Sequence, residues 1–139
     1  MILFCDTSAL VKLYIEEVDS DVCLGLAQQA SAIAVSRIAW AEAHTDFARR
    51  IRDNEADRKT IEQAKQRLAS HWSDYFILEV SQPIVESAAD YADAFALRAY
   101  DSVQLASAMA LQGSTTEAIH FACFDLRLRK AAQVLKLIV

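Results

Sequence analysis

Residues 1–10 read MILFCDTSAL. Five apolar residues precede Asp6, and two hydroxyl residues and a further apolar pair follow it. The apolar run over residues 1–5 indicates a short buried strand, and residues 8–15 indicate a helix. Asp6 therefore lies where a strand gives way to a helix. An aspartate at such a point has two explanations, because it can cap the helix or serve chemistry at the edge of a sheet.

The rest of the chain continues this alternation of short apolar segments with longer helical ones. Further strands are expected at 32–36, 75–79 and 118–124, with a short terminal strand over LKLIV. Helices are expected at 20–30, 37–54 and 56–73, from Ser81 to about Leu97, from Asp101 to Gly113, and from Asp125 to about Gln133. Such alternation favours a parallel sheet covered on both faces. The sequence predicts an α/β protein, a three-layer α/β/α sandwich with a central, mostly parallel sheet, in a single domain over 1–139.

The composition is that of a folded protein with few breaks. The chain holds 54% hydrophobic residues but only two glycines and one proline, which favours regular elements with short connections. No apolar run reaches the roughly 18 residues of a membrane span, and no signal-peptide pattern is present. The three cysteines lack metal-binding spacing, and two lie in apolar runs as buried, reduced thiols do. We therefore expect a cytoplasmic protein without a membrane segment.

Four carboxylates lie at or near places where ligands bind in parallel sheets, outside the carboxyl ends of the strands. Asp6 and Asp125 each follow a predicted strand, and Glu42 lies in the opening turns of the helix after another strand. Asp101 opens a helix, and its position at the same edge is an assumption. Four carboxylates in one pocket repel one another strongly unless cations neutralise them.

Each of these acids also has a structural explanation. Aspartate is a preferred helix N-cap, which stabilises a helix by about 1 kcal/mol, and three of the four precede helical segments. Asp101 and Gln104 form a capping-box-like pair, and Glu42 lies off the apolar stripe of its helix, as on a solvated face. The hydroxyl residues after the first aspartate can cap the helix in its place, so capping alone does not require an acid there. The four acids taken together favour a shared site more strongly than any one of them does.

An acidic site without histidine or cysteine suits hard divalent cations, which take oxygen ligands, and Mg²⁺ among them usually keeps several waters. Such ions activate a water and stabilise both oxygens of an in-line phosphoryl displacement. His44, His71 and His120 are scattered without metal-ligand spacing, and no Gly-rich phosphate loop is present. The pattern therefore predicts hydrolysis of a phosphodiester or a phosphate ester.

Four segments resemble the motifs of PIN-domain ribonucleases, in particular toxins of the VapC type. They are FCDTSALVKLY, SRIAWAEAHTDFAR, LRAYDSVQLASAMAL and FACFDLRLRKAAQVLKL. The resemblance spans nearly the whole chain and implies a PIN-like fold. It also implies a Mg²⁺ or Mn²⁺ site formed by the acids that match the family's cluster, with supporting hydroxyls at Ser8 and Thr7. These matching acids are Asp6, Glu42, Asp101 and Asp125.

The resemblance further implies a metal-dependent endoribonuclease that acts as the toxin of a toxin–antitoxin pair, binds a small antitoxin and forms a homodimer. Two positions depart from the family's pattern, because Cys123 stands where Thr is frequent and Lys136 where Gly is frequent. The first removes a hydroxyl that would support Asp125, and the second alters the last turn. Neither departure removes one of the four acids.

Two alternatives stay open. An Asp-dependent phosphatase of another α/β type fits the sequence DTS less well, because Ser8 stands where a second acid belongs. A degenerate PIN-like interaction module without activity is the other, and the presence of all four acids argues against it. A phosphate-monoester assay separates the first from a nuclease, and metal titration separates the second.

Substrate RNA needs positive charge near the pocket, although the net charge of −5 disfavours a general coat for nucleic acids. Arg98 precedes Asp101 by three residues, and Arg127 and Arg129 lie in the first turns after Asp125. Arg49 lies two turns along its helix from the glutamate, on the same face. The structural explanation is that these arginines pair with surface acids such as Asp46 or Asp93.

Overall fold

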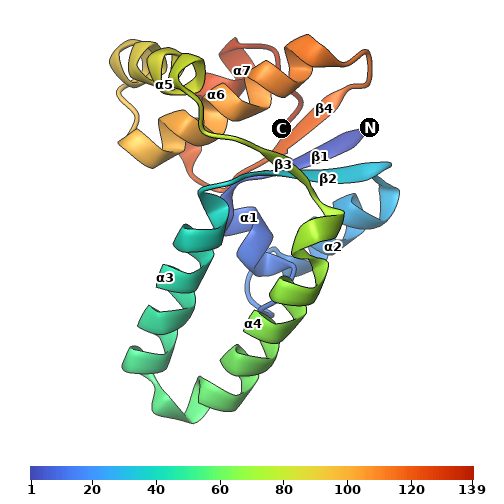
Figure 1. Ribbon diagram of the computed structural model, residues 1–139, viewed down its shortest axis with the longest axis vertical. Coiled ribbons are helices and arrows are strands. Elements are labelled where there is room, and N and C mark those ends of the chain that lie inside the picture. Colours follow the sequence, from blue (N-terminus) through green and yellow to red (C-terminus); the bar gives the residue numbers. More distant parts are fainter.

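The computed structural model describes residues 1–139 and is built on a four-stranded sheet in the order β3-β2-β1-β4, with every neighbouring pair parallel (Figure 1). The strands are β1 (Ile2–Cys5), β2 (Ala32–Ser36), β3 (Phe76–Leu78) and β4 (Ile119–Ala122). The helices are α1 (Thr7–Lys12), α2 (Ser20–Gln29), α3 (Ala39–Asp53), α4 (Arg58–His71), α5 (Gln82–Phe95), α6 (Ala99–Ser114) and α7 (Leu126–Val134), with 3₁₀ turns at Glu55–Asp57 and Trp72–Asp74.

The sheet separates two hydrophobic cores, because successive side chains of a strand point to opposite faces. Leu3 and Cys5 of β1 are buried with apolar residues of α1, α3 and α4, whereas Phe4 is buried with residues of α6 and α7. Phe4 and Phe121 lie side by side on that second face, with ring centroids 5.6 Å apart. Figure 1 shows α1 to α4 on one side of the sheet and α5 to α7 on the other. The predicted α/β/α sandwich is therefore confirmed.

Two helix-end predictions were wrong near the start and end of α6. Ala96 ends α5 in the left-handed conformation, with φ 53°, so the chain reverses within two residues and α6 begins at Ala99 with Arg98 as its N-cap. Asp101 consequently lies inside the first turn rather than at the cap. Gly113 lies within the last turn, because the helix continues to Ser114.

The C-terminal residues form less strand than expected. The segment LKLIV pairs with β4 only through a single parallel bridge between His120 and Ile138. Lys136 adopts a left-handed φ of 65° just after α7, and two backbone hydrogen bonds close the helix there in a Schellman motif. The last turn therefore keeps the geometry that favours glycine, and a lysine holds it at a cost of roughly 1 kcal/mol. None of the helices combines the length and apolar character needed to cross a membrane.

Candidate functional site

A pocket with a volume of about 450 Å³ opens at the carboxyl end of the sheet. Its walls come from the residues that follow β1 and β4, from α1, from α3 between Glu42 and Arg50, and from the first turns of α6. All four acids singled out in the sequence line this one pocket, including the one whose position was assumed: Asp6, Glu42, Asp101 and Asp125.

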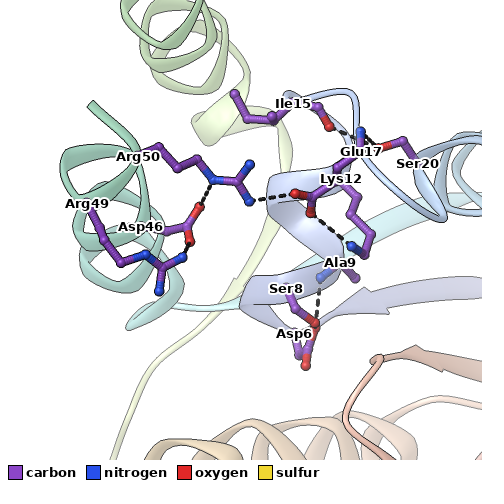
Figure 2. Close-up of polar contacts among 10 residues, drawn as sticks. All are labelled: Asp6, Ser8, Ala9, Lys12, Ile15, Glu17, Ser20, Asp46, Arg49 and Arg50. Carbon is purple, nitrogen blue, oxygen red and sulfur yellow. Dashed lines mark hydrogen bonds and ion pairs between the residues drawn. The ribbon is translucent and has the colours of Figure 1, made fainter. Parts of the chain in front are cut away.

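Asp6 is both a helix cap and a pocket residue. Its Oδ1 accepts hydrogen bonds from the Ala9 backbone N–H at 2.9 Å, as the N-cap of α1, and from the Ser8 hydroxyl at 2.7 Å (Figure 2). The residue is only 5% exposed. The two explanations offered for this aspartate are therefore compatible, and the hydroxyl residues that follow it do not replace it as the cap.

The environment of Asp6 favours its protonated form. Burial is the largest cause, and the charges of Asp101 and Glu42 act in the same direction, against the two hydrogen bonds that favour the carboxylate. Together these effects raise the pKa of Asp6 from 3.8 to about 7. Near neutral pH the pocket therefore holds an acid that a bound cation would return to its charged form.

We expect this raised pKa to make the metal-free protein less stable as the pH rises. Because the folded pKa of Asp6 lies above the unfolded value, the stability gained by its protonation is complete below about pH 4 and is lost as the pH rises through about 7. The free energy of unfolding, relative to that of Asp6→Asn, should fall by about 3 kcal/mol between pH 5 and pH 8, at roughly 1.4 kcal/mol for each pH unit up to the folded pKa. Urea denaturation in chelator at both pH values measures it, and a constant difference would contradict the raised pKa.

Glu42 faces the pocket and is not on a solvated face. Its Oε1 accepts hydrogen bonds from the Thr7 hydroxyl at 2.8 Å and from Nε2 of Gln104 at 2.9 Å. The same Nε2 lies 3.1 Å from Oγ1 of Thr7. In the sequence we assigned Gln104 only a capping role. The signal that could have connected it to the pocket is its spacing of three residues from Asp101, which puts both side chains on one face of α6.

Arg98 connects the two remaining acids. Its Nε donates to Oδ2 of Asp101 at 3.1 Å, and its Nη2 lies 3.9 Å from Oδ2 of Asp125. Asp125 also caps α7, because its Oδ1 accepts the Leu128 backbone N–H at 2.9 Å. Cys123 makes no hydrogen bond to this aspartate, and its burial, with the nearby charge of Asp6, raises the pKa of the thiol to about 12. The helix start thus holds Asp125 in position without a hydroxyl at position 123.

The donor set suits a hard divalent cation. In each of the four carboxylates one oxygen takes a hydrogen bond from the chain and the other takes none. Only Oε1 of Gln104 is both fully buried and without a partner, so the free oxygens of Asp6, Glu42 and Asp101 remain open to solvent. No three His, Cys, Asp or Glu side chains lie close enough to chelate a cation directly. The acids therefore fit Mg²⁺ held partly through its waters, the mode usual for this ion.

Beside the acids, the pocket wall carries a network of ion pairs, which Figure 2 shows. Asp46 pairs with Arg49 and, at 2.7 Å, with Nε of Arg50, whose Nη2 lies 2.6 Å from Oε2 of Glu17. Lys12 pairs with the other oxygen of Glu17 at 2.9 Å. Three positively charged side chains thus pair with two carboxylates. Of the three, the Arg49 side chain, which is 59% exposed, is the one most open to solvent.

The other arginines singled out in the sequence are distributed unequally. The Arg98 side chain is 80% exposed and lines the acidic pocket. Arg127 lines an adjoining hollow and donates to the carbonyl oxygen of Ala96 at 3.0 Å. Arg129 lines a different hollow with His120, because residues two apart on a helix point in different directions. Arg49 pairs with Asp46, as the structural explanation for that arginine predicted.

Comparison with known proteins agrees with this architecture. A family model described as the PIN domain matches residues 3–134. Two relatives from strains of Mycobacterium tuberculosis, "Ribonuclease VapC45" and "Ribonuclease VapC49", are each 29% identical over 110 residues, which is 79% of this chain and 76% of theirs.

Solved structures share the fold at lower identity. A toxin–antitoxin complex from Klebsiella pneumoniae has a TM-score of 0.62 at 21% identity, covering 90% of this chain and 87% of that one. VapBC2 from Rickettsia felis, bound to a DNA fragment from its promoter, has a TM-score of 0.66 at 18% identity, covering 99% of this chain and 96% of that one. FitAcB from Neisseria gonorrhoeae has a TM-score of 0.67 at 22% identity, covering 100% of this chain and 96% of that one. At these identities the likeness establishes the fold alone.

Proposed function

This chain belongs to the PIN domain family, and we propose that it is a divalent-metal-dependent endoribonuclease that hydrolyses RNA phosphodiester bonds in the acidic pocket. The observation that carries the proposal is the meeting of four carboxylates, from four separate segments, in one pocket with a solvent-open oxygen on most of them. The names of the two relatives support RNA as the substrate. The decisive test is RNA cleavage by the purified protein, with the cut sites mapped by sequencing RNA ends.

In this proposal Asp6, Glu42, Asp101 and Asp125 hold Mg²⁺ or Mn²⁺ through the oxygens that the chain leaves free. The cation would supply an activated water and would offset the charge that develops on the phosphate. The Ser8 hydroxyl donates to Oδ1 of Asp6 at 2.7 Å, and the Thr7 hydroxyl donates to Oε1 of Glu42 at 2.8 Å. These hydrogen bonds keep the two carboxylates oriented before a cation binds.

The two alternatives fit these observations less well. A phosphatase with an aspartate nucleophile would need a second acid two residues on, whereas Ser8 stands there and donates its hydroxyl to Asp6. An inactive interaction module has no use for four acids gathered around a polar pocket. Hydrolysis of a phosphate monoester in place of RNA would favour the phosphatase, and failure to bind Mn²⁺ would favour the inactive module.

We further propose that the ribonuclease is the toxin of a toxin–antitoxin pair, that it forms a homodimer, and that it acts in the cytoplasm. The structural neighbours support this role, since one is itself described as a toxin–antitoxin complex. The three free, buried cysteines suit a reducing compartment. The test is growth arrest after induced expression, relieved when a small open reading frame beside the gene is expressed with it and its product copurifies.

Arg98 and Arg127 are proposed to hold RNA phosphates beside the acids, with Arg49 as a further contact. Changing Arg98 and Arg127 together to glutamine should weaken RNA binding and reduce the slope of log affinity against log salt by about 1.4, because two phosphate contacts each release about 0.7 counterions from a single strand. A salt titration in the Asp6→Asn background, where RNA is not cut, measures this slope.

The matched control for this titration removes two positive charges from positions on α7 that do not line the acidic pocket. Arg129→Gln with Lys130→Gln should leave the salt slope nearly unchanged, since Arg129 lines a different hollow. If instead the first pair leaves the slope unchanged, the RNA path lies elsewhere, and Arg50, Arg52 and Arg58 become the next candidates.

A further inference from the structure

Gln104 is a buried polar side chain in the wall of the acidic pocket. It is 2% exposed and comes from α6, one turn after Asp101. Its amide nitrogen donates to Glu42 and lies against Thr7, whereas its carbonyl oxygen Oε1 is fully buried with no hydrogen-bond partner. No other buried side-chain polar atom in the chain lacks a partner. A buried, unpaired carbonyl destabilises a protein, so this glutamine has to be explained by something other than stability.

We propose that Gln104 is a positioning residue that fixes the carboxylate of Glu42 for cation binding. This inference rests on the proposed function, because it assumes that Glu42 is a ligand. Both donors to Glu42, the hydroxyl of Thr7 and the amide of Gln104, bind the same oxygen, Oε1. The carboxylate is therefore held at one oxygen from two directions, by α1 and by α6, and Oε2 is turned free toward the pocket.

The chemistry of an amide explains why glutamine occupies this position. An arginine or lysine would hold Glu42 as firmly but would cancel the negative charge that attracts a cation, whereas a neutral amide orients the carboxylate and leaves its charge intact. The amide cannot turn over, because its carbonyl would then face the carboxylate of Glu42. The unpaired Oε1 is thus the consequence of directing Nε2 at Glu42.

The position also ties two acids to one element. Asp101 and Gln104 are three residues apart on α6, so they lie on one face of the helix. α6 consequently supplies one acid directly and orients a second through Gln104, although Glu42 itself comes from α3. A shift of α6 would move both acids together.

The test uses Gln104→Met, which keeps the length of the side chain and removes both the donor and the unpaired carbonyl. We expect the variant to bind Mn²⁺ about 10- to 100-fold more weakly by calorimetry, as is usual when a residue that supports a metal ligand is lost. The kcat for an RNA oligonucleotide carrying a mapped cut site should fall by a similar factor with little change in KM. The Tm without metal should change little, because the hydrogen bonds to Glu42 and Thr7 are lost together with the buried carbonyl that has no partner. Thr7→Val should act in the same direction, and Thr7→Ser should restore the wild-type values.

The matched control is Gln112→Met, a glutamine on the same helix whose amide bonds backbone groups of Glu117 and Ile119. It should lower the Tm and leave Mn²⁺ affinity unchanged. In a Glu42→Gln background, Gln104→Met should have no further effect on Mn²⁺ binding, because it acts only through Glu42.

The outcomes separate this inference from the proposed function. If the wild-type protein binds Mn²⁺ and cuts RNA but Gln104→Met does both equally well, the positioning role is overturned and the proposed function stands. The positioning role is also overturned if a fall in the Tm of Gln104→Met accounts for its whole loss of Mn²⁺ binding. The same follows if Gln104→Met weakens Mn²⁺ binding as much in the Glu42→Gln background as in the wild-type protein. If the wild-type protein neither binds Mn²⁺ nor cuts RNA, the proposed function itself fails.

Discussion

Asp101→Asn should abolish RNA cleavage and leave the fold intact. Asp101 lies inside the first turn of α6 and does not cap it, so the helix keeps its start when the charge is removed. Asparagine keeps the shape of the side chain and can still accept the hydrogen bond from Arg98, but it no longer attracts a cation. Because a metal ion contributes several kcal/mol to such a reaction, we expect the rate to fall by about 10³-fold or more. Initial rates of RNA cleavage, together with circular dichroism, measure the two parts of this result.

Asp6→Asn should have the same effect on cleavage, and it separates the two roles of that residue. Asparagine is also a good N-cap, so the cap on α1 is retained and only the charge is lost. The control is Asp93→Asn on α5, an acid that lies outside the pocket. Wild-type cleavage by a folded Asp6→Asn protein would mean that Asp6 only caps the helix, and the proposed site would then lose its most buried acid.

Removal of divalent cations should reduce cleavage to background, and addition of Mg²⁺ or Mn²⁺ should restore it. The same cations should raise the Tm, because they bind the folded acidic cluster and relieve the repulsion among its members. A ligand at a hundredfold excess over its dissociation constant adds about 2.7 kcal/mol to the free energy of unfolding. Differential scanning calorimetry with and without metal, at matched ionic strength, measures the shift.

The control for this stabilisation is the Asp101→Asn protein, in which most of the metal-dependent rise in Tm should disappear. Sodium chloride at the same ionic strength should give neither the rise in Tm nor the return of cleavage. A wild-type Tm that does not respond to Mn²⁺ would show that the four acids do not share a cation. Cleavage that persists in chelator would remove the metal from the proposal.

The sequence alone was sufficient for the alternation of strands and helices and for the places of Asp6, Glu42 and Asp125 in it, whereas the position of Asp101 was assumed. Short apolar runs bounded by polar residues identify buried parallel strands, because burial on both faces excludes polar side chains. The strand 32–36 has the bounds predicted for it. Asp125 was expected to open a helix, and it caps α7, because a cap depends on hydrogen bonds between residues three apart. These features are local, so a few neighbouring residues determine them.

Only the tertiary structure decided which side chains face one another. Gln104 contacts Glu42 across 62 positions and Thr7 across 97, and neither pairing has a local pattern. The start of α6 at Ala99 was missed because it depends on the reversal after α5, and the separation of Arg129 from the pocket depends on how α7 lies on the sheet. The physical reason is that periodicity shows which face of an element is buried, whereas the packing of helices against the sheet determines where each polar side chain meets its partner.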